Sequence, residues 1–255
     1  MFELSSVDRL DILKLLRKTP LKLSHISKRL DFTVQETSRN ISRLSDAHII
    51  AKNVDGTFSL TSYGEEAFNL LSGYKVLFKN RNYFLNHDLS KLPGHFRDCL
   101  GILEDFVLVD DVMVMFNNIE NMIANAKKFV WIVSDQILAS TIPYLVEALN
   151  REVEFKLLLP RKFLPTDNMR NLVSNPVFEK ASRAKQLDMR FLDDVDVFLC
   201  LSESEVSALA FMDSSNKLDY RGFKSSTDSA VDWSRILYSY YWSISSSRIP
   251  DQLFR

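Results

Sequence analysis

The sequence contains little cysteine and little glycine, and each shortage excludes a class of site. Cys99 and Cys200 are the only two cysteines in 255 residues. They lie far apart without paired neighbours, so they provide neither a CxxC metal clip nor a disulfide framework, and we interpret them as buried thiols. The six glycines form no GxGxxG or GxxxxGKS pattern, so we expect no glycine-rich phosphate loop and no cofactor.

Long hydrophobic runs are also missing. No stretch reaches the roughly 18 consecutive apolar residues of a membrane-spanning helix, and the N-terminal residues MFELSSVDRL have neither a basic head nor an apolar signal core. We therefore expect a cytoplasmic protein without membrane segments. A hydrophobic content of 46% is sufficient for packed cores, and the length allows one large domain or two modest ones.

The formal net charge of -1 conceals an uneven distribution. Residues 1–52 carry ten Lys or Arg against six Asp or Glu, an excess of four positive charges. The remaining residues carry 22 Lys or Arg against 27 Asp or Glu, an excess of five negative charges. A basic front on an acidic body is typical of a chain that docks on nucleic acid at one end, although ordinary solvated surfaces also produce such an excess.

A polar and basic helix is predicted over Thr33–Ser45. Glu36 follows Thr33 by three residues, a capping box that satisfies free backbone amides at a helix start. The face opposite to Ile41 and Leu44 carries amide, hydroxyl and guanidinium groups, which pair with base edges and phosphates. The competing interpretation is a short solvated helix for protein contacts. The candidates for DNA recognition on this face are Gln35, Ser38, Arg39, Ser42 and Arg43.

Two more helices and a hairpin flank this segment. Asp55-Gly56 between two apolar-containing runs is the strongest short signal for a hairpin. Three helices followed by a hairpin form a winged helix, whose last helix enters the major groove of DNA, and Lys52 and Gly56 complete the predicted DNA-binding residues. The predicted flanking elements are Val7–Arg17, Ser24–Leu30, Ile49–Val54 and Thr57–Leu60.

A long helix is predicted from Thr61 to about Asn86. The residues along one side of this helix are spaced alternately four and three positions apart, as in a two-helix coiled coil. We predict that the helix pairs with the same helix of a second subunit. Ser72-Gly73 weakens the middle of this seam, and the alternative is packing on the C-terminal domain. A dimer held in this way would place two recognition helices about 34 Å apart, as a palindromic DNA site requires. The seam residues are Tyr63, Ala67, Leu70, Tyr74, Leu77, Arg81 and Phe84.

The second half alternates apolar runs with helices, which predicts a mostly parallel or mixed sheet covered by helices. Ligands collect at the carboxyl ends of the strands in such sheets. The residues after two predicted strands are therefore pocket candidates, namely Ser134, Asp135 and Gln136, and Arg161 and Lys162. The predicted strands are Phe129–Val133, Val153–Leu159, Gln186–Phe191, Val195–Leu201 and Val206–Met212, and the predicted helices are Asn117–Lys127, Ala139–Arg151 and Ser229–Ser246.

Two further groups of residues have both a functional and a packing interpretation. His87 and His95 lack a partner with metal-ligand spacing beyond Asp88, so we favour caps and packing over a metal site. The aromatic residues of the last helix fit a core or a dimer surface. Positive and hydroxyl groups before that helix suit an anion, and the candidates are Arg221, Lys224, Ser225 and Ser226.

Several segments carry a family resemblance. Arg9–Ile50, a wing and LTSYG resemble the winged-helix regulators of archaea and bacteria, although many members have Gly where this chain has His48. The run NYFLNHDLSKLPGHF (Asn82–Phe96) and the tail RGFKSSTDSAVDWSRILYSYYWSIS (Arg221–Ser245) resemble archaeal regulators with a methanogenesis-regulator type of effector domain, related to the TrmB-like regulators. The resemblance implies a DNA-binding regulator with a C-terminal sensor.

The second half is also similar to the phospholipase D superfamily, whose half-domain carries His-x-Lys followed four residues later by Asp. The corresponding segment is VSALAFMD, in which Asp213 occupies the Asp position. Val206 replaces the His and Ala208 the Lys, so the nucleophile and the phosphate-holding cation are absent. We therefore expect no enzymatic activity.

These patterns together predict an α+β protein in three parts: a winged-helix DNA-binding domain (1–62), a helical linker and dimerisation segment (63–98) and an α/β effector domain (99–255). The favoured function is a dimeric transcriptional regulator that binds double-stranded DNA and senses a small molecule or a partner. The alternatives are a phosphodiesterase-like enzyme with a winged-helix targeting domain and a ligand-free interaction adaptor.

Overall fold

The computed structural model describes residues 6–162 and 175–247. The chain forms two compact units, Met1–Val76 and Leu77–Arg255. This division differs from the three predicted parts. The predicted linker is split, with residues 63–76 in the first unit and residues 77–98 in the second. Residues 1–5 of the predicted first part and residues 163–174 and 248–255 of the predicted third part lie outside the described residues.

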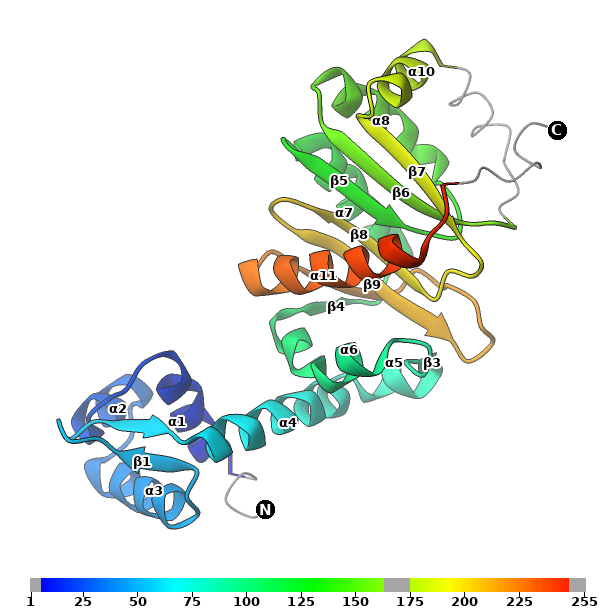
Figure 1. Cartoon of the computed structure of the whole chain (residues 1–255). Coiled ribbons are helices and arrows are strands. Elements are labelled where there is room, and N and C mark those ends of the chain that lie inside the picture. Colours follow the sequence, from blue (N-terminus) through cyan, green and yellow to red (C-terminus); the bar gives the residue numbers. More distant parts are fainter. Residues whose placement is uncertain (1–5, 163–174, 248–255) are drawn as a thin grey trace. The chain divides into compact units, whose positions relative to one another are not determined.

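The first unit consists of three helices followed by a two-stranded antiparallel sheet (Figure 1). Ile12, Leu13 and Leu44 are fully buried at its centre, so each helix is held by the apolar stripe seen in the sequence. Leu21 adds a short bridge to Phe58. The elements are α1 Val7–Lys18, α2 Leu23–Leu30, α3 Val34–Asp46, β1 Ile50–Lys52 and β2 Phe58–Leu60.

Both ends of α3 follow from local chemistry. The Thr33 side chain accepts a hydrogen bond from the Glu36 backbone N–H, and the Glu36 carboxylate accepts one from the Thr33 N–H at 3.0 Å, which confirms the predicted capping box. The Thr33 hydroxyl also donates to the Glu36 carboxylate, and this bond, followed by the bond from the Thr33 N–H, lowers the pKa of Glu36. His48, just beyond the helix, has a φ of +55°, a left-handed conformation that glycine adopts most easily.

The hairpin differs from the predicted two-residue turn. β1 ends at Lys52 and β2 begins at Phe58, so five residues connect the two strands. The Asn53 N–H donates to the Thr57 carbonyl oxygen and closes this loop. Gly56 lies within it at a φ of +80°, which explains why glycine is needed there.

The long helix predicted after Thr61 is interrupted. α4 spans Ser62–Lys79 and α5 spans Arg81–Asn86, with Asn80 between them at a non-helical ψ of 32°. The half-buried ring of Phe84 stacks on Phe223 within the second unit, 5.8 Å between centroids. The prediction of one continuous helix to about Asn86 was therefore wrong beyond Lys79.

The second unit is built on an eight-stranded mixed sheet with the order β4-β10-β9-β8-β5-β6-β7, with β3 paired to β9. β5, β6 and β7 are parallel to one another, and the other pairings are antiparallel. The mixed form of the predicted sheet is therefore present. The strands are β3 His87–Asp88, β4 Val107–Val109, β5 Phe129–Val133, β6 Glu154–Pro160, β7 Leu187–Leu192, β8 Val197–Ser202, β9 Val206–Asp213 and β10 Gly222–Ser225.

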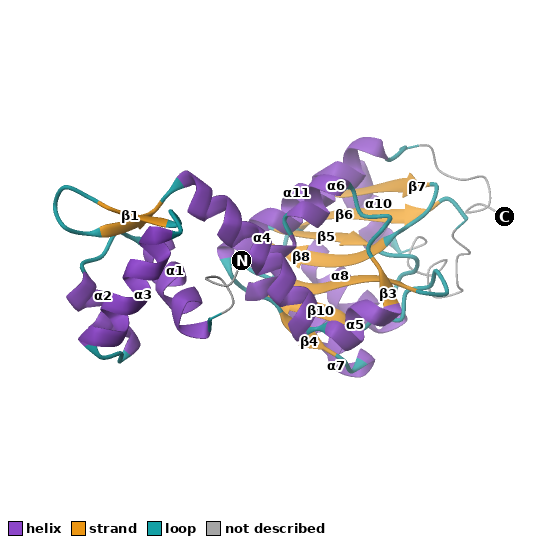
Figure 2. Cartoon of the chain, turned by 90° about the horizontal axis from the view of Figure 1, so that it is seen from below, coloured by secondary structure: helices purple, strands orange, loops and turns teal. Residues whose placement is uncertain are grey.

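Helices cover both faces of this sheet, with α11 on one face and α7 and α8 on the other (Figure 1, Figure 2). Side chains alternate between the faces along β5, so Trp131 contacts Tyr238 of α11, whereas Ile132 faces α7 and α8. The helices and 3-10 turns are α6 Gly94–Asp98, η2 Leu100–Asp105, α7 Val112–Asn125, η3 Ala139–Thr141, α8 Ile142–Asn150, α10 Pro176–Arg183 and α11 Asp228–Ile244.

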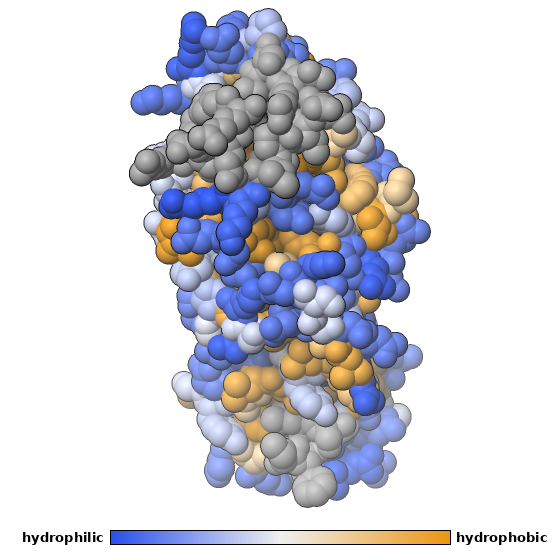
Figure 3. All heavy atoms as spheres, turned by 90° about the vertical axis from the view of Figure 1, so that its right-hand side faces the viewer, coloured by the Kyte–Doolittle hydropathy of each residue, from blue (hydrophilic) through white to orange (hydrophobic). Residues whose placement is uncertain are grey.

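Most of the apolar side chains lie inside the two units. On the face in Figure 3, hydrophilic residues predominate and hydrophobic residues form separate patches. None of the helices in the described ranges combines the length and the hydropathy that a membrane crossing requires.

Gly64 provides a test of how α4 joins the first unit. A Cβ at Gly64 would overlap the backbone carbonyl of Ile49, whereas a Cβ at Gly56 would meet nothing within 4 Å. We expect Gly64→Ala to lower the free energy of unfolding of the first unit by about 3 kcal/mol or more, because backbone must move. Gly56→Ala, which is strained only by its φ, should cost about 1 kcal/mol.

The measurement is urea unfolding followed by far-UV circular dichroism. All three tryptophans lie in the second unit, so tryptophan fluorescence reports on that unit and serves as the internal control. Equal losses for the two variants would contradict the close approach of α4 to Ile49.

Candidate functional site

The outward face of α3 is polar, basic and exposed. Its five predicted DNA-binding residues are all solvent-exposed, whereas Thr37, Ile41 and Leu44 are buried on the opposite face. Neither Arg39 nor Arg43 forms an ion pair with another residue in the described ranges, so both guanidinium groups are available to an anion. The five exposed residues are Gln35, Ser38, Arg39, Ser42 and Arg43.

The hairpin supplies a second group of exposed atoms in the same unit. Lys52 is exposed at the end of β1, and Gly56 lies in the loop that follows. The Asp55 carboxylate accepts hydrogen bonds from the Thr57 hydroxyl and backbone N–H, which lower the pKa of Asp55. The hairpin therefore presents the cation of Lys52, while the Asp55 carboxylate in the adjoining loop is already hydrogen-bonded to Thr57.

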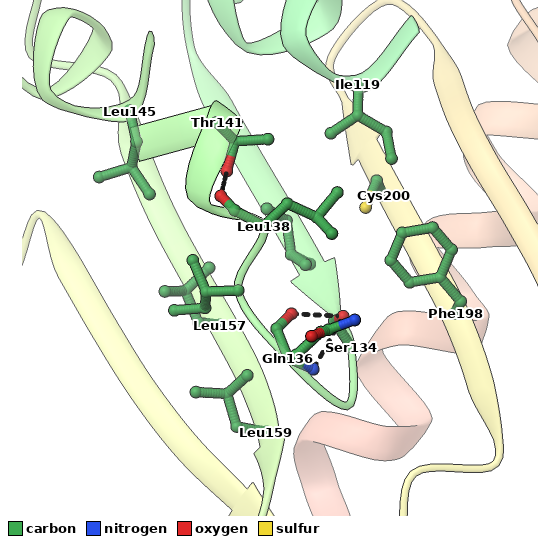
Figure 4. Close-up of a pocket in the computed structure, with 12 residues that line it drawn as sticks. Ile119, Ser134, Gln136, Leu138, Thr141, Leu145, Leu157, Leu159, Phe198 and Cys200 are labelled. Atoms are coloured by element: carbon green, nitrogen blue, oxygen red, sulfur yellow. Dashed lines mark hydrogen bonds between the residues drawn. The ribbon is translucent and has the colours of Figure 1, made fainter. Parts of the chain in front are cut away.

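The second unit contains an apolar recess at the carboxyl ends of β5 and β6, on the face covered by α7 and α8 (Figure 4). Most of its space is open to solvent, and its cavity volume is about 20 Å³, roughly the room that one water molecule needs. The recess lies on this face because side chains at paired positions of neighbouring strands point to the same side of a sheet. The lining residues are Ile119, Ile132, Ser134, Gln136, Ile137, Leu138, Thr141, Leu145, Leu157, Leu159, Phe198 and Cys200.

Tyr220 lies beside the residues at the mouth of this recess. Its hydroxyl donates to the Asp135 carboxylate at 2.7 Å and accepts a hydrogen bond from the Gln136 side-chain amide. Its ring packs edge-on against Phe198, 5.1 Å between centroids, and Phe198 lines the recess. Burial and then the Asp135 carboxylate raise the pKa of Tyr220, so the phenol stays protonated and donates.

The backbone of Tyr220 is strained. Its φ of +60° is a left-handed conformation that costs a bulky residue about 1–3 kcal/mol. The neighbouring residues hold it there, because the Asp219 carboxylate accepts hydrogen bonds from the backbone N–H and the guanidinium of Arg221. We call Asp219, Tyr220 and Arg221 the 219–221 strap.

The strap also contacts the first elements of the second unit. The buried ring of His87 in β3 lies between the Tyr83 carbonyl oxygen, 2.7 Å from Nδ1, and the Asp219 carboxylate, 3.2 Å from Nε2. The Tyr83 hydroxyl donates to the Arg221 carbonyl oxygen and accepts from the Phe211 N–H. His87 is therefore a packed, hydrogen-bonded residue.

Electrostatics hold Asp219 in its charged form. Partial burial alone would raise the pKa of this carboxyl, but hydrogen bonds from His87 and Arg221 outweigh burial, so the pKa lies below its usual value. Burial raises the pKa of the Tyr83 hydroxyl. Arg221 also approaches the Asp110 carboxylate at 3.5 Å. The strap is thus fixed by charge-assisted bonds at one end and by Tyr220 at the other.

The predicted ligand-binding residues do not form one cluster. Ser134, Asp135 and Gln136 lie together at the recess, whereas Arg161 pairs with Asp193 at 2.9 Å. Arg221 and Ser225 lie at opposite ends of β10. The Ser225 hydroxyl donates to the Asp105 carbonyl oxygen, and Thr227 caps α11, so the structure does not gather the predicted anion site before that helix.

Comparisons with known proteins give a limited result. No protein-family model and no curated protein matches the sequence. The structure is similar to that of TrmBL2, an archaeal chromatin protein described as having a novel mode of DNA binding, with a TM-score of 0.44, 12% identity and coverage of 95% of this chain and 94% of that chain. It is also similar to Nuc of Salmonella typhimurium, a phospholipase D family member, with a TM-score of 0.37, 10% identity and coverage of 50% and 86%. Scores this low assign neither a family nor a function.

No local pattern predicts the residues that lie beside the recess. Tyr220 stands 85 positions from Asp135 and outside every predicted element, so only the fold brings the two together. The positive φ of Tyr220 has no local sequence signature either, since left-handed residues are usually Gly, Asn or Asp. Phe116, which packs on the Tyr220 ring, lies in a turn of α7 that the prediction left out.

Acidification tests the role of Asp219. Because its folded-state pKa is depressed, its contribution to stability is complete above the unfolded value of about 4 and is lost as the pH falls through the folded value. We expect Asp219→Asn to be less stable than the parent at pH 7, and the difference to shrink towards pH 3. Urea unfolding followed by tryptophan fluorescence measures both values. A difference that is independent of pH would contradict the charged role.

Proposed function

We propose that this chain is a DNA-binding transcriptional regulator whose first unit is a winged helix. The exposed face of α3 supports the proposal most directly. It presents two guanidinium groups, an amide and two hydroxyls on a rigid helix, and these groups bind base edges and phosphates. A helix with a filled capping box and a buried opposite face holds them in a fixed arrangement, which base recognition requires.

In this proposal α3 enters the major groove and the hairpin follows the adjacent backbone. Arg39 and Arg43 lie one turn apart on the exposed face, so one can read a base while the other binds a phosphate. Lys52 on β1 supplies a phosphate contact. The Gly56 loop, which carries no side chain at its left-handed position, can approach the sugar-phosphate backbone closely.

We further propose that two copies pair through α4. Tyr63, Leu70 and Leu77 are spaced seven residues apart, and their exposed fractions are 65%, 73% and 37%. Apolar side chains in such a row on an exposed helix are typical of a pairing surface. The pairing length is limited to Ser62–Lys79, because the helix ends before Asn80.

The second unit serves as the sensor in this proposal. A ligand that favours one arrangement of the paired first units changes the affinity for the operator by its differential binding to the two states. The recess beside Ser134 and Gln136 is the candidate for the sensor site, because it is concave, mostly apolar and lies at the carboxyl ends of parallel strands.

The phosphodiesterase alternative has a weaker basis. Val206 and Ala208 are fully buried in β9 and bear no group that attacks or holds a phosphate. The Asp213 carboxylate accepts hydrogen bonds from the backbone N–H groups of Ser215 and Lys217, so it already stabilises a turn. Turnover of a generic phosphodiester that Asp213→Asn abolishes would revive this alternative. An interaction adaptor without a ligand would keep the fold and lose the sensor.

The α3 face predicts how DNA binding responds to mutation. Arg39→Ala should weaken binding to the chain's own upstream DNA by about 1–3 kcal/mol if Arg39 contacts a base, with less effect on random DNA. If Arg39 contacts a phosphate, both DNAs should bind more weakly, and the slope of log K against log salt should fall by about 1.

Fluorescence anisotropy at several salt concentrations measures both quantities. Lys180→Ala removes an exposed cation on α10 of the second unit and serves as the charge-matched control, with no expected effect. If the parent protein shows no preference for its upstream DNA over random DNA, the regulator proposal fails.

Pairing through α4 predicts a change of mass in solution. Leu70→Glu places a charge in the middle of the exposed row and should convert a dimer of the parent into a monomer in sedimentation velocity. Ser62→Glu adds the same charge in the first turn of α4, outside the row, and should leave the dimer intact. A parent protein that sediments as a monomer at micromolar concentration would exclude this dimer.

A further inference from the structure

We propose that α3 selects thymine at one position of its DNA site, and that Val34 is the residue that contacts the 5-methyl group of this base. The inference rests on the DNA-binding role proposed above and names a base that the exposed face selects. It is carried by the exposed apolar side chain at the start of α3, by the hydroxyl one turn further on and by the capping box that holds both in place.

The exposed face of α3 consists of two rows of side chains, because residues four positions apart are neighbours on a helix. One row is uncharged, and the other carries both guanidinium groups. Guanidinium groups bind guanine and phosphates, so the uncharged row suits a different base. The uncharged row is Val34, Ser38 and Ser42, and the charged row is Gln35, Arg39 and Arg43.

Val34 is the apolar residue of α3 that the core does not cover. It is the first residue of the helix, and 64% of it is exposed, whereas Ile41 and Leu44 are buried. A valine in a helix keeps mainly one rotamer, so its two methyl groups are held in one direction. Aliphatic side chains of this kind contact the thymine methyl group, which the major groove presents beside the O4 acceptor.

Ser38 supplies the donor that the thymine O4 requires. Its hydroxyl is exposed, and within the described ranges it has no hydrogen-bond partner. Ser42, at the other end of the row, lies 3.5 Å from the Asp46 carboxylate, whose charge disfavours an approach of DNA at that end. The base contacts of this row are therefore concentrated at Val34 and Ser38.

The capping box fixes the turn that carries Val34. The Thr33 N–H and hydroxyl donate to the Glu36 carboxylate at 3.0 and 2.8 Å, and the Glu36 N–H donates to the Thr33 hydroxyl at 3.2 Å. A turn closed in this way loses little freedom when Val34 meets a base. The same bonds engage the Glu36 carboxylate, which would otherwise accept from the N4 amino group of cytosine.

The test changes single methyl groups on the DNA and uses the full-length protein. Repeated selection from random duplexes first supplies a preferred site, and uracil then replaces each of its thymines in turn. Uracil keeps the O4 and the base pairing and lacks only the methyl group. We expect one position at which uracil raises the Kd by about three- to fourfold, as the loss of one buried methyl group predicts.

The complementary change adds the methyl group to another base. With a C·G pair at the sensitive position, 5-methylcytosine should bind about three- to fourfold more tightly than cytosine, because the methyl group occupies the same place in the groove. Fluorescence anisotropy measures the four dissociation constants at one salt concentration.

Two valine variants locate the contact on the protein. Val34→Ala should abolish both methyl effects, and it should leave the far-UV circular dichroism unchanged, because the site is exposed and alanine is the best helix former. Val7→Ala is the matched control, since Val7 is the first residue of α1 and is 71% exposed. It should retain the full difference between thymine and uracil.

The outcomes separate this inference from the regulator proposal. Equal binding of thymine and uracil at every position, or an equal uracil penalty in the parent and in Val34→Ala, would overturn the inference and leave a regulator with a preferred site. If selection enriches no sequence over random DNA, the regulator proposal itself fails and the thymine contact is rejected with it.

Discussion

The second unit depends on the position of β5 between a parallel and an antiparallel neighbour. β5 runs parallel to β6 and antiparallel to β8, so the carboxyl ends of β5 and β6 meet the amino end of β8 at one edge. The recess exists because of this arrangement, since Ser134 follows β5 while Phe198 is the second residue of β8. The antiparallel pairing of β8 with β9 then returns the chain to the same edge, where the strap begins.

Local chemistry made much of the fold predictable. The Thr33–Glu36 capping box fixed the start of α3, and the alternating or continuous apolar runs located β5, β6, β8 and β9 to within about two residues. The exposed face of α3 could also be derived, because helical periodicity separates Ile41 from Arg39. His48 is an instructive departure: the chain keeps the left-handed turn that usually takes glycine and accepts its strain.

The remainder depends on contacts between residues that are distant in the sequence. β4 and β10 are short and owe their pairing to each other and to β9, so neither run is distinctive alone. The break at Asn80 arises where the heptad spacing continues but Phe84 is held by Phe223 of the second unit, so tertiary packing overrides the periodic pattern. Tyr220 meets Asp135 and Gln136 only after the whole sheet has formed.

The strap limits the size of any signal that the second unit can send. Its contact with β3 is a hydrogen bond between a buried imidazole and a carboxylate, and bonds of this kind contribute about 1.5–3 kcal/mol. A ligand that breaks or strengthens this one contact therefore changes an equilibrium between two arrangements by roughly 10- to 150-fold. That range is sufficient for graded regulation and falls short of the roughly 10⁴-fold that a complete switch from one state to the other requires. In the proposed regulator, a sensor built on this strap would modulate DNA binding, and an all-or-none response would need contributions from both copies of the proposed dimer.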